Sequence, residues 1–293
     1  MTITPERVDL PGAGLQLAAD RWGDPGAPPV VFLHGAGQSR RAWDASARVI
    51  AEHGWHAITV DHRGHGDSDW PDAADYDWDH FADDITGIVD HLGTPPVVVG
   101  ASLGGMSALL AQARTDTQLF RAVVLVDVTP RMELDGVKRI VGFMASNPDG
   151  FDSLDHASDV IATYTGRPKP ENPDGLRQVL RQDSAGRWQW HWDIRFLDGR
   201  ADQVLGGDLA ALRQNSVRDL LHDGARNIRV PTLVVRGANS DLVSPEGVKE
   251  FVDIVPGARY IDVADAGHMV AGDQNDHFTT AIVDFLDTLP PTT

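Results

Sequence analysis

The residues with the clearest chemical potential lie in the pentapeptide Gly100-Ala101-Ser102-Leu103-Gly104. Three valines at 97–99 precede it and good helix formers follow from Met106, so the sequence predicts a strand, a sharp turn and a helix. In such a turn the serine hydroxyl is exposed, and its small neighbours let the strand and the helix approach closely. We therefore predict that Ser102 is a nucleophile.

A serine hydroxyl is a weak nucleophile at neutral pH and needs a base. His268 is the candidate, because a neutral imidazole can accept the proton of Ser102 and later return it to the leaving group. A carboxylate would fix the tautomer of this imidazole and stabilise its charged form. Asp127 and Asp241 both follow expected strands, so either residue can supply that carboxylate.

Backbone amides that bind a developing oxyanion are expected at the end of another strand. The apolar run 30–33 predicts a buried strand, and His34-Gly35-Ala36-Gly37 after it predicts a tight turn. We expect the amide of Ala36 to act together with the amide of Leu103. On the alternative interpretation the tetrapeptide is only a loop.

The elements that must position these residues alternate along the chain. Apolar runs predict strands at 55–60, 97–99, 122–127, 232–237 and 259–263, a hairpin over 8–22, and helices over 42–53, 79–92 and 274–289. Strands that alternate with helices indicate a parallel, doubly wound sheet. Ligands bind at the carboxyl ends of such strands, where Ala36, Ser102 and Asp127 are expected.

This alternation stops between residues 129 and 226. Four amphipathic helical pieces are expected there, at 134–146, 153–165, 175–182 and 208–223. We therefore divide the chain into an α/β core of residues 1–128 and 227–293 and a helical cap of residues 129–226, which would cover the crevice.

Large apolar side chains in the cap can either line a substrate pocket or pack the cap onto the core. They are Met132, Phe143, Met144, Trp188, Trp190, Trp192 and Phe196. Among them we expect Trp188 and Trp190 to contact substrate, together with Gly35 and Met269.

Two patterns imitate metal sites. His53, His56, His62 and His65 lie close in sequence, but the expected helix end, strand and loop would point them in different directions. The acidic segment 75–79 resembles the start of a calcium loop, yet His80 replaces the required glycine. We expect no metal site and no cofactor.

Composition limits the partners. The formal net charge of −18 disfavours nucleic acid and anionic lipid, and the absence of cysteine excludes disulfides and thiolate chemistry. The N-terminus lacks the apolar segment of a signal peptide, and no later run is long enough to span a bilayer, so we expect a cytoplasmic protein. The expected partner is a small-molecule substrate, and the sequence leaves a homodimer open.

These motifs together resemble the α/β-hydrolase family. The resemblance rests on His34-Gly35, on Asp61-x-Arg63-Gly64-x-Gly66-x-Ser68, on the turn at Ser102, on Gly237-x-x-x-Asp241 and on Gly267-His268. It covers almost the whole chain, and the order Ser, Asp, His is the order of the family.

The resemblance implies an α/β-hydrolase fold: a mostly parallel eight-stranded sheet, flanked by helices, with an α-helical cap inserted after strand six. It also favours Asp241 over Asp127 as the acid, because the spacing before a proline-led helix at Asp241 is the usual one. Relatives that open epoxides or remove halide carry an aspartate in place of Ser102. A serine there favours attack on a carbonyl.

We therefore expect a serine hydrolase of the carboxylesterase or lactonase type that cleaves a small, mostly apolar ester through an acyl-enzyme on Ser102. The enzymatic alternatives are a carbon–carbon bond hydrolase of the dienoate type and a cofactor-free perhydrolase. Arg63, Arg131 and Arg195 are candidates to hold a substrate carboxylate. The alternative outside enzymology is a ligand receptor on the same fold.

Overall fold

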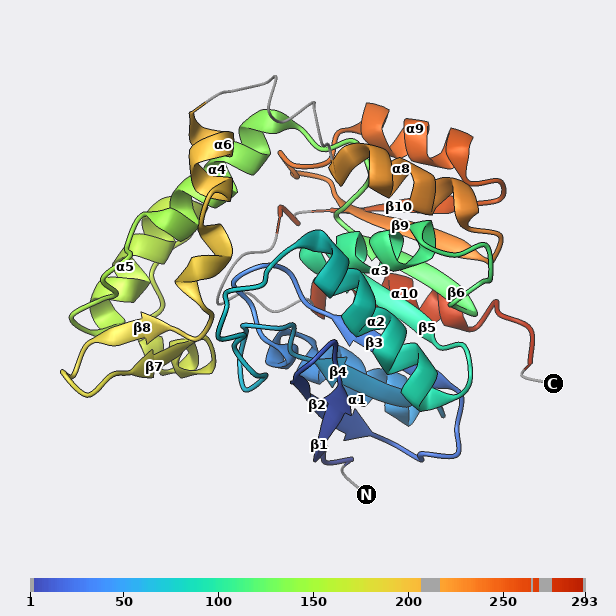
Figure 1. Ribbon diagram of the computed structural model, residues 1–293, viewed down its shortest axis with the longest axis horizontal. Coiled ribbons are helices and arrows are strands. Elements are labelled where there is room, and N and C mark those ends of the chain that lie inside the picture. The colour runs from blue at the N-terminus through green and yellow to red at the C-terminus, as the bar shows by residue number, and fades with distance from the viewer. Residues whose placement is uncertain (1–2, 207–216, 265, 269–275, 292–293) are drawn as a thin grey trace.

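A single eight-stranded sheet organises the computed structural model, which describes residues 3–206, 217–264, 266–268 and 276–291 (Figure 1). The strand order is β1-β2-β4-β3-β5-β6-β9-β10. β2 pairs antiparallel with β1 and β4, and the other neighbours are parallel. The strands are β1 (Glu6–Pro11), β2 (Gln16–Trp22), β3 (Pro29–Leu33), β4 (His56–Val60), β5 (Val97–Ala101), β6 (Ala122–Val126), β9 (Thr232–Gly237) and β10 (Arg259–Val263).

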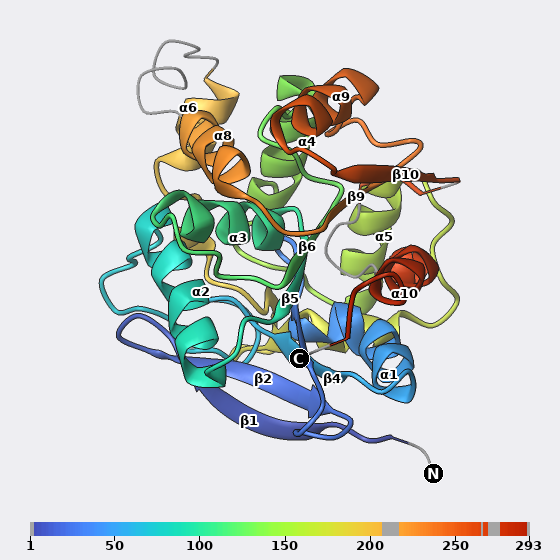
Figure 2. The same cartoon turned by 90° about the vertical axis from the view of Figure 1, so that its right-hand side faces the viewer.

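Helices cover both faces of the sheet, as Figure 2 shows nearly edge-on. One face carries α2 (Trp78–Leu92), α3 (Leu103–Ala113), α8 (Val217–Asn227) and α9 (Pro245–Ile254). The other face carries α1 (Asp44–Glu52), which the 3₁₀ turn η1 (Arg40–Trp43) precedes, and α10 (Thr279–Leu286), which η4 (Asp276–Phe278) precedes. None of the helices in the described ranges is long and apolar enough to cross a membrane.

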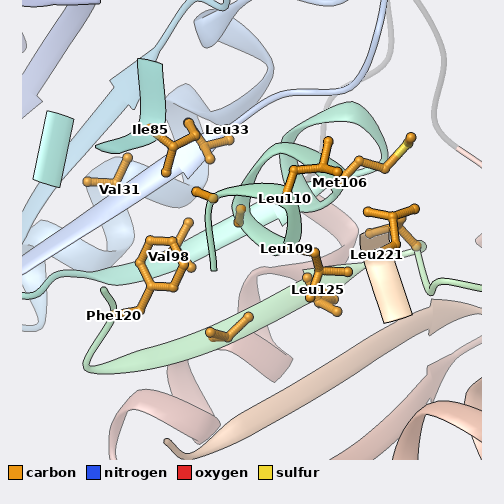
Figure 3. Close-up of a cluster of buried hydrophobic side chains, with 14 of the residues drawn as sticks. Val31, Leu33, Ile85, Val98, Met106, Leu109, Leu110, Phe120, Leu125 and Leu221 are labelled. Carbon is orange, nitrogen blue, oxygen red and sulfur yellow. The ribbon is translucent and has the colours of Figure 1, made fainter. Parts of the chain in front are cut away.

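Burial on both faces explains the apolar runs that predict these strands. In β3, Val31 and Leu33 belong to the core beneath α3, whereas Val30 and Phe32 belong to the core beneath α1 and α10. Figure 3 shows Leu109 and Leu110 of α3 among the side chains of the first of these cores. Successive side chains of a strand point to opposite faces, so the central strands β3, β5 and β6 carry non-polar residues at every position.

The cap lies to one side of the sheet in Figure 1. Its elements are α4 (Leu134–Ala145), α5 (Leu154–Thr165), η2 (Pro173–Gln178), β7 (Leu180–Gln182), β8 (Trp188–Trp190), η3 (Ile194–Leu197) and α6 (Arg200–Leu205). The expected α/β-hydrolase fold, with a mostly parallel eight-stranded sheet flanked by helices, is confirmed.

Three details of the cap differ from the sequence predictions. The helix expected over 175–182 is a 3₁₀ turn followed by a strand, and β7 pairs antiparallel with β8 in a small hairpin. The strand at 188–190 has only three residues, a pattern too brief to recognise in sequence. The helix expected over 208–223 lies partly outside the described residues, and its remainder in α8 packs on α3 of the core rather than in the cap.

A buried ion pair ties the N-terminal hairpin to the rest of the core. Arg63, in the loop after β4, donates from Nε and Nη2 to the two carboxylate oxygens of Asp84 on α2, each at 2.7 Å. The Asp84 carboxylate also accepts the amide of Ala13 at 2.8 Å. Burial raises the pKa of Asp84 even though the guanidinium opposes the shift. The pair therefore links three segments at the cost of desolvating two charges.

Arg63→Met leaves the carboxyl group of Asp84 buried without its guanidinium. We expect the free energy of unfolding to fall by about 3–5 kcal/mol, measured by urea denaturation at neutral pH. The control is Arg114→Met, because Arg114 pairs with Asp83 of the same helix at a half-exposed site. That variant should lose less than about 1 kcal/mol, and equal losses would contradict the account.

Candidate active site

Ser102 sits in a strained turn between β5 and α3. Its backbone has φ 46° and ψ −113°, a conformation that costs a non-glycine residue free energy and is often associated with function. Glycines make the turn compact: a Cβ on Gly100 would lie 2.5 Å from the amide nitrogen of Gly105, and one on Gly104 would lie 2.4 Å from the carbonyl oxygen of Leu33. The predicted strand, turn and helix are therefore present with the serine between them.

His268 is hydrogen-bonded to Asp127. The Nδ1 atom of the imidazole lies 2.7 Å from Oδ2 of the carboxylate, and both side chains are nearly buried. An ionised carboxylate only accepts hydrogen bonds, so the proton lies on Nδ1 and Nε2 is left free to accept one. This is the tautomer that a general base for a hydroxyl requires.

Asp127 lies at the end of the strand next to the one that precedes Ser102. It follows β6, its φ is 50°, and its amide donates to the carbonyl of Val235 in β9 at 2.7 Å. The amide of Ser102 donates to the carbonyl of Val126 at 3.1 Å, so the two strained residues lie at adjacent strand ends. The carboxylate also accepts hydrogen bonds from the amide of Gly237 and the hydroxyl of Ser240, at 3.2 and 2.8 Å.

The prediction that Asp241 is the partner of the imidazole is therefore wrong. The Asp241 side chain is 39% exposed and binds Arg139 of α4, with Nε–Oδ2 and Nη2–Oδ1 distances of 2.6 and 3.0 Å. The loop after β9 turns so that the carbonyl of Asp241 packs against Gly136, which directs its side chain to the cap. Asp127 emerges from the strand next to that of Ser102 and reaches the imidazole instead.

The predicted oxyanion turn follows β3. The amide of Gln38 donates to the carbonyl of Gly35 at 3.1 Å, and Gly37 has a φ of 78°, as a tight turn with a left-handed residue requires. A Cβ on Gly35 would lie 3.4 Å from Cβ of Ser102, so this turn contacts Ser102 directly. Leu103 is the first residue of α3, where an amide has no partner within the helix.

Two groups hold the peptide unit that joins Gly35 to Ala36. Nε2 of His34 accepts the amide of His62 at 3.0 Å, so Nδ1 carries the proton and donates to the carbonyl of Gly35 at 2.8 Å. The amide of Gln38 donates to the same carbonyl. The carbonyl and amide of one trans peptide point in opposite directions, so fixing the Gly35 carbonyl also fixes the direction of the Ala36 amide.

An apolar cluster joins the cap to the site. Leu103 is buried in it together with Phe143 and Met144 of α4, and Ala36 packs against it. Trp190 lies deeper in the cap, with its ring centroid 5.9 Å from that of Phe143, and Trp188 stacks beneath Arg177 at 4.8 Å. Both tryptophans thus have packing partners in the cap, and their contact with substrate stays a prediction. Met269 lies outside the described residues.

The three arginines considered as carboxylate holders are all paired within the protein. Arg63 binds Asp84, and Nη2 of Arg195 lies 2.6 Å from Oδ2 of Asp193. Arg131 lies 3.7 Å from a carboxylate oxygen of Glu250 and 3.9 Å from one of Glu133. Any of them would have to leave an internal carboxylate in order to bind a substrate carboxylate.

The rings of His34, His62 and His65 pack together next to the turn after β3. Of the four histidines considered as a metal site, only His62 and His65 belong to this group, with ring centroids 6.5 Å apart. The centroids of His62 and His65 lie 4.8 and 5.3 Å from that of His34. Their nitrogens do not converge: within the described ranges, no group of three or more His, Asp or Glu side chains could hold a metal ion. Burial lowers the pKa of His34 to about 4 and that of His65 to about 3, so these rings are neutral packing groups.

Sequence reasoning did not single out three residues that shape the site, Gln38, Arg139 and Ser240, and it named His34 only as part of a turn motif. Their roles depend on which backbone groups they reach, and spacing along the chain does not encode this. Asp127 had a usable signal, since an acidic residue directly after the strand adjacent to that of Ser102 is well placed to reach the same crevice.

Comparisons with known proteins agree with the fold. Residues 28–273 match the family model described as alpha/beta hydrolase fold. The chain is 30% identical to an esterase of Mycobacterium tuberculosis over 281 residues, which cover 93% of this chain and 87% of the relative.

Two further similarities extend the comparison. The chain is 32% identical to a bifunctional esterase/perhydrolase of Acinetobacter calcoaceticus over 270 residues, 85% of this chain and 87% of the relative. The solved structure of an alpha/beta hydrolase from Novosphingobium aromaticivorans superposes with a TM-score of 0.76 at 23% identity, over 97% of this chain and 98% of that one.

The buried histidines predict a loss of stability in acid. Burial also lowers the pKa of His191 to about 4, whereas the pKa of a histidine in the unfolded chain is about 6.5. Below about pH 6.5 the unfolded chain binds protons that native His34, His65 and His191 do not, so the free energy of unfolding falls as the pH falls. Each histidine contributes at most about 1.4 kcal/mol per pH unit down to its native pKa.

Urea denaturation at a series of pH values between about 4.5 and 7.5 measures this slope. Asp44, whose pKa burial raises to about 6, acts in the opposite sense and offsets part of the slope. The matched variant His191→Gln removes one histidine and keeps Asp44, so its slope should be shallower than that of the wild type. An identical slope in the two proteins would contradict the prediction.

Proposed function

The chain belongs to the α/β-hydrolase family and is an ester-hydrolysing enzyme, and from this premise we propose that it cleaves a carboxylic ester or lactone through an acyl-enzyme on Ser102. The observation that carries the proposal is the buried hydrogen bond between His268 and Asp127 at the strand end next to Ser102. This bond leaves Nε2 of the imidazole available as a base.

The proposed reaction has two halves. His268 accepts the hydroxyl proton of Ser102 at Nε2 as the oxygen attacks the carbonyl carbon, and the amides of Ala36 and Leu103 bind the resulting oxyanion. The imidazolium then donates its proton to the departing alkoxide, which leaves an acyl ester on Ser102. Water, deprotonated by the same imidazole, attacks that ester, and the proton returns to the serine as the acid departs.

The substrate is proposed to be small and mostly uncharged. Apolar side chains of α4 share a cluster with Leu103, so an acyl or alcohol group under the cap meets hydrocarbon. Arg63, Arg131 and Arg195 are already paired with carboxylates, and the net charge of −18 disfavours anionic substrates.

Two of the alternatives receive less support. A carbon–carbon hydrolase of the dienoate type would need a polar pocket for a carboxylate, and the three candidate arginines bind internal acids instead. A receptor with vestigial turnover has no need of an imidazole held in the basic tautomer beside a strained serine.

Perhydrolysis is the second candidate that an observation favours, because the relative from Acinetobacter calcoaceticus is a bifunctional esterase/perhydrolase. The same acyl-enzyme would be attacked by hydrogen peroxide in place of water, giving a peracid and free Ser102. The two reactions differ only in the second nucleophile, so one site can carry both.

Ser102→Ala should lower kcat for p-nitrophenyl acetate about a thousandfold or more, because no acyl-enzyme can form. Ser107→Ala is the matched control: Ser107 lies on the same helix and its hydroxyl donates to the carbonyl of Leu103. The control should keep activity within about threefold of the wild type. Retention of activity in Ser102→Ala would contradict the proposed function.

A second pair of variants tests the identity of the acid. Asp127→Asn should reduce kcat by about 1,000-fold or more, because an amide at this position stabilises the wrong imidazole tautomer. Asp241→Asn removes the same charge from a partly exposed side chain and should lower kcat by about tenfold at most. Steady-state kinetics on the same ester decides between Asp127 and Asp241 as the acid. A larger loss of kcat in Asp241→Asn than in Asp127→Asn would overturn the assignment of Asp127.

A further inference from the structure

The hydroxyl of Ser240 is the least expected partner of Asp127. It lies 2.8 Å from Oδ2, in the loop between β9 and α9. Its oxygen also accepts the amides of Leu242 and Val243, at 3.2 and 3.1 Å. A serine oxygen has two acceptor positions and one proton. Because the two amides occupy the acceptor positions, the proton points to the carboxylate.

Ser240 and His268 therefore share one oxygen of Asp127. Nδ1 of the imidazole and the serine hydroxyl both donate to Oδ2, whereas the amide of Gly237 donates to Oδ1. A second donor on Oδ2 fixes the plane of the carboxylate relative to the imidazole. It also withdraws negative charge from the oxygen that faces the imidazole, which limits how strongly Asp127 holds the imidazole proton.

We propose that Ser240 is a positioning residue for the hydrolysis, which acts through Asp127 to orient the imidazole of His268 and to limit its basicity. The inference rests on the proposed function of Ser102 and His268. Ser240 has no contact with the reacting atoms in this scheme, and it completes the hydrogen-bond shell of a carboxylate that is 3% exposed.

The cap fixes the loop that carries Ser240. The amide of Glu133, at the start of α4, donates to the carbonyl of Leu242 at 2.8 Å, and Arg139 pairs with Asp241. The carboxylate of Glu133 also accepts the hydroxyl of Ser244, in the same loop. The loop after β9 therefore connects α4 of the cap to Asp127.

The test is the pH profile of kcat for p-nitrophenyl acetate in the full-length enzyme carrying Ser240→Ala. We expect kcat to fall about tenfold, and its acid limb to move to higher pH, because the carboxylate without the serine donor holds the imidazole proton more firmly. Ser240→Thr keeps the hydroxyl and should restore both the rate and the limb.

The matched control is Ser244→Ala. Ser244 lies in the same loop, caps α9 by accepting the amide of Gly247 at 3.2 Å, and donates to Glu133 rather than to Asp127. Its variant should lose thermal stability and keep the wild-type limb. The proposal would be overturned if the acid limb of the pH profile of kcat did not move in Ser240→Ala. It would also be overturned if that limb moved by the same amount in Ser244→Ala.

Two further measurements keep the outcomes distinct. If Ser240→Ala does not fold, Ser240→Gly removes the same hydroxyl with no side chain to place, and the same displacement is expected. Ser102→Ala is assayed in parallel: its inactivity beside a wild-type profile in the Ser240 variants would reject only this inference. Activity in Ser102→Ala would reject the proposed function itself.

Discussion

The hydrogen bond between His268 and Asp127 depends on strands that are far apart in sequence ending at one edge of the sheet. Asp127 is held in a left-handed conformation by the backbone of β9, and Ser102 is held in one between β5 and α3. Both conformations cost free energy, and the packing of the buried parallel strands must offset this cost. The site is therefore a consequence of the register of β5, β6 and β9, rather than of local sequence around the serine alone.

The same principle extends to the turn that is proposed to bind the oxyanion. His34 and Gln38 hold the carbonyl of Gly35, and the amide of His62 fixes the tautomer of His34. Donors that are oriented before substrate arrives cost no reorganisation during the reaction. The neutral, buried histidines behind the turn give the protein this rigidity at neutral pH and make it sensitive to acid.

The cap is fastened to the core at two separated places. At one end α4 meets the loop after β9, through Glu133 and Arg139. At the other end the amide of Gly66 donates to the carbonyl of His191 at 2.7 Å, and the hydroxyl of Tyr76 donates to Asp193 at 2.6 Å. An insertion fixed at both ends holds its apolar cluster against Leu103 and Ala36.

Sequence predicted most of this fold because the central strands β3, β5 and β6 are non-polar throughout and glycines mark the close approaches. Val30 to Leu33 and the turn at Ser102 are examples of such strong local signals. The choice between Asp127 and Asp241 failed because it depends on how one loop turns, and spacing alone favoured the wrong residue. The sequence also did not predict the hairpin of β7 and β8 or the packing of α8 on α3, because tertiary contacts decide both.

The most direct test of the central claim is a crystal structure of the enzyme after reaction with a fluorophosphonate. The account predicts a phosphonyl group on Oγ of Ser102, its free oxygen within hydrogen-bond distance of the amides of Ala36 and Leu103, and Nδ1 of His268 on Asp127. An adduct on another residue, or an imidazole turned from Asp127 to Asp241, would contradict it.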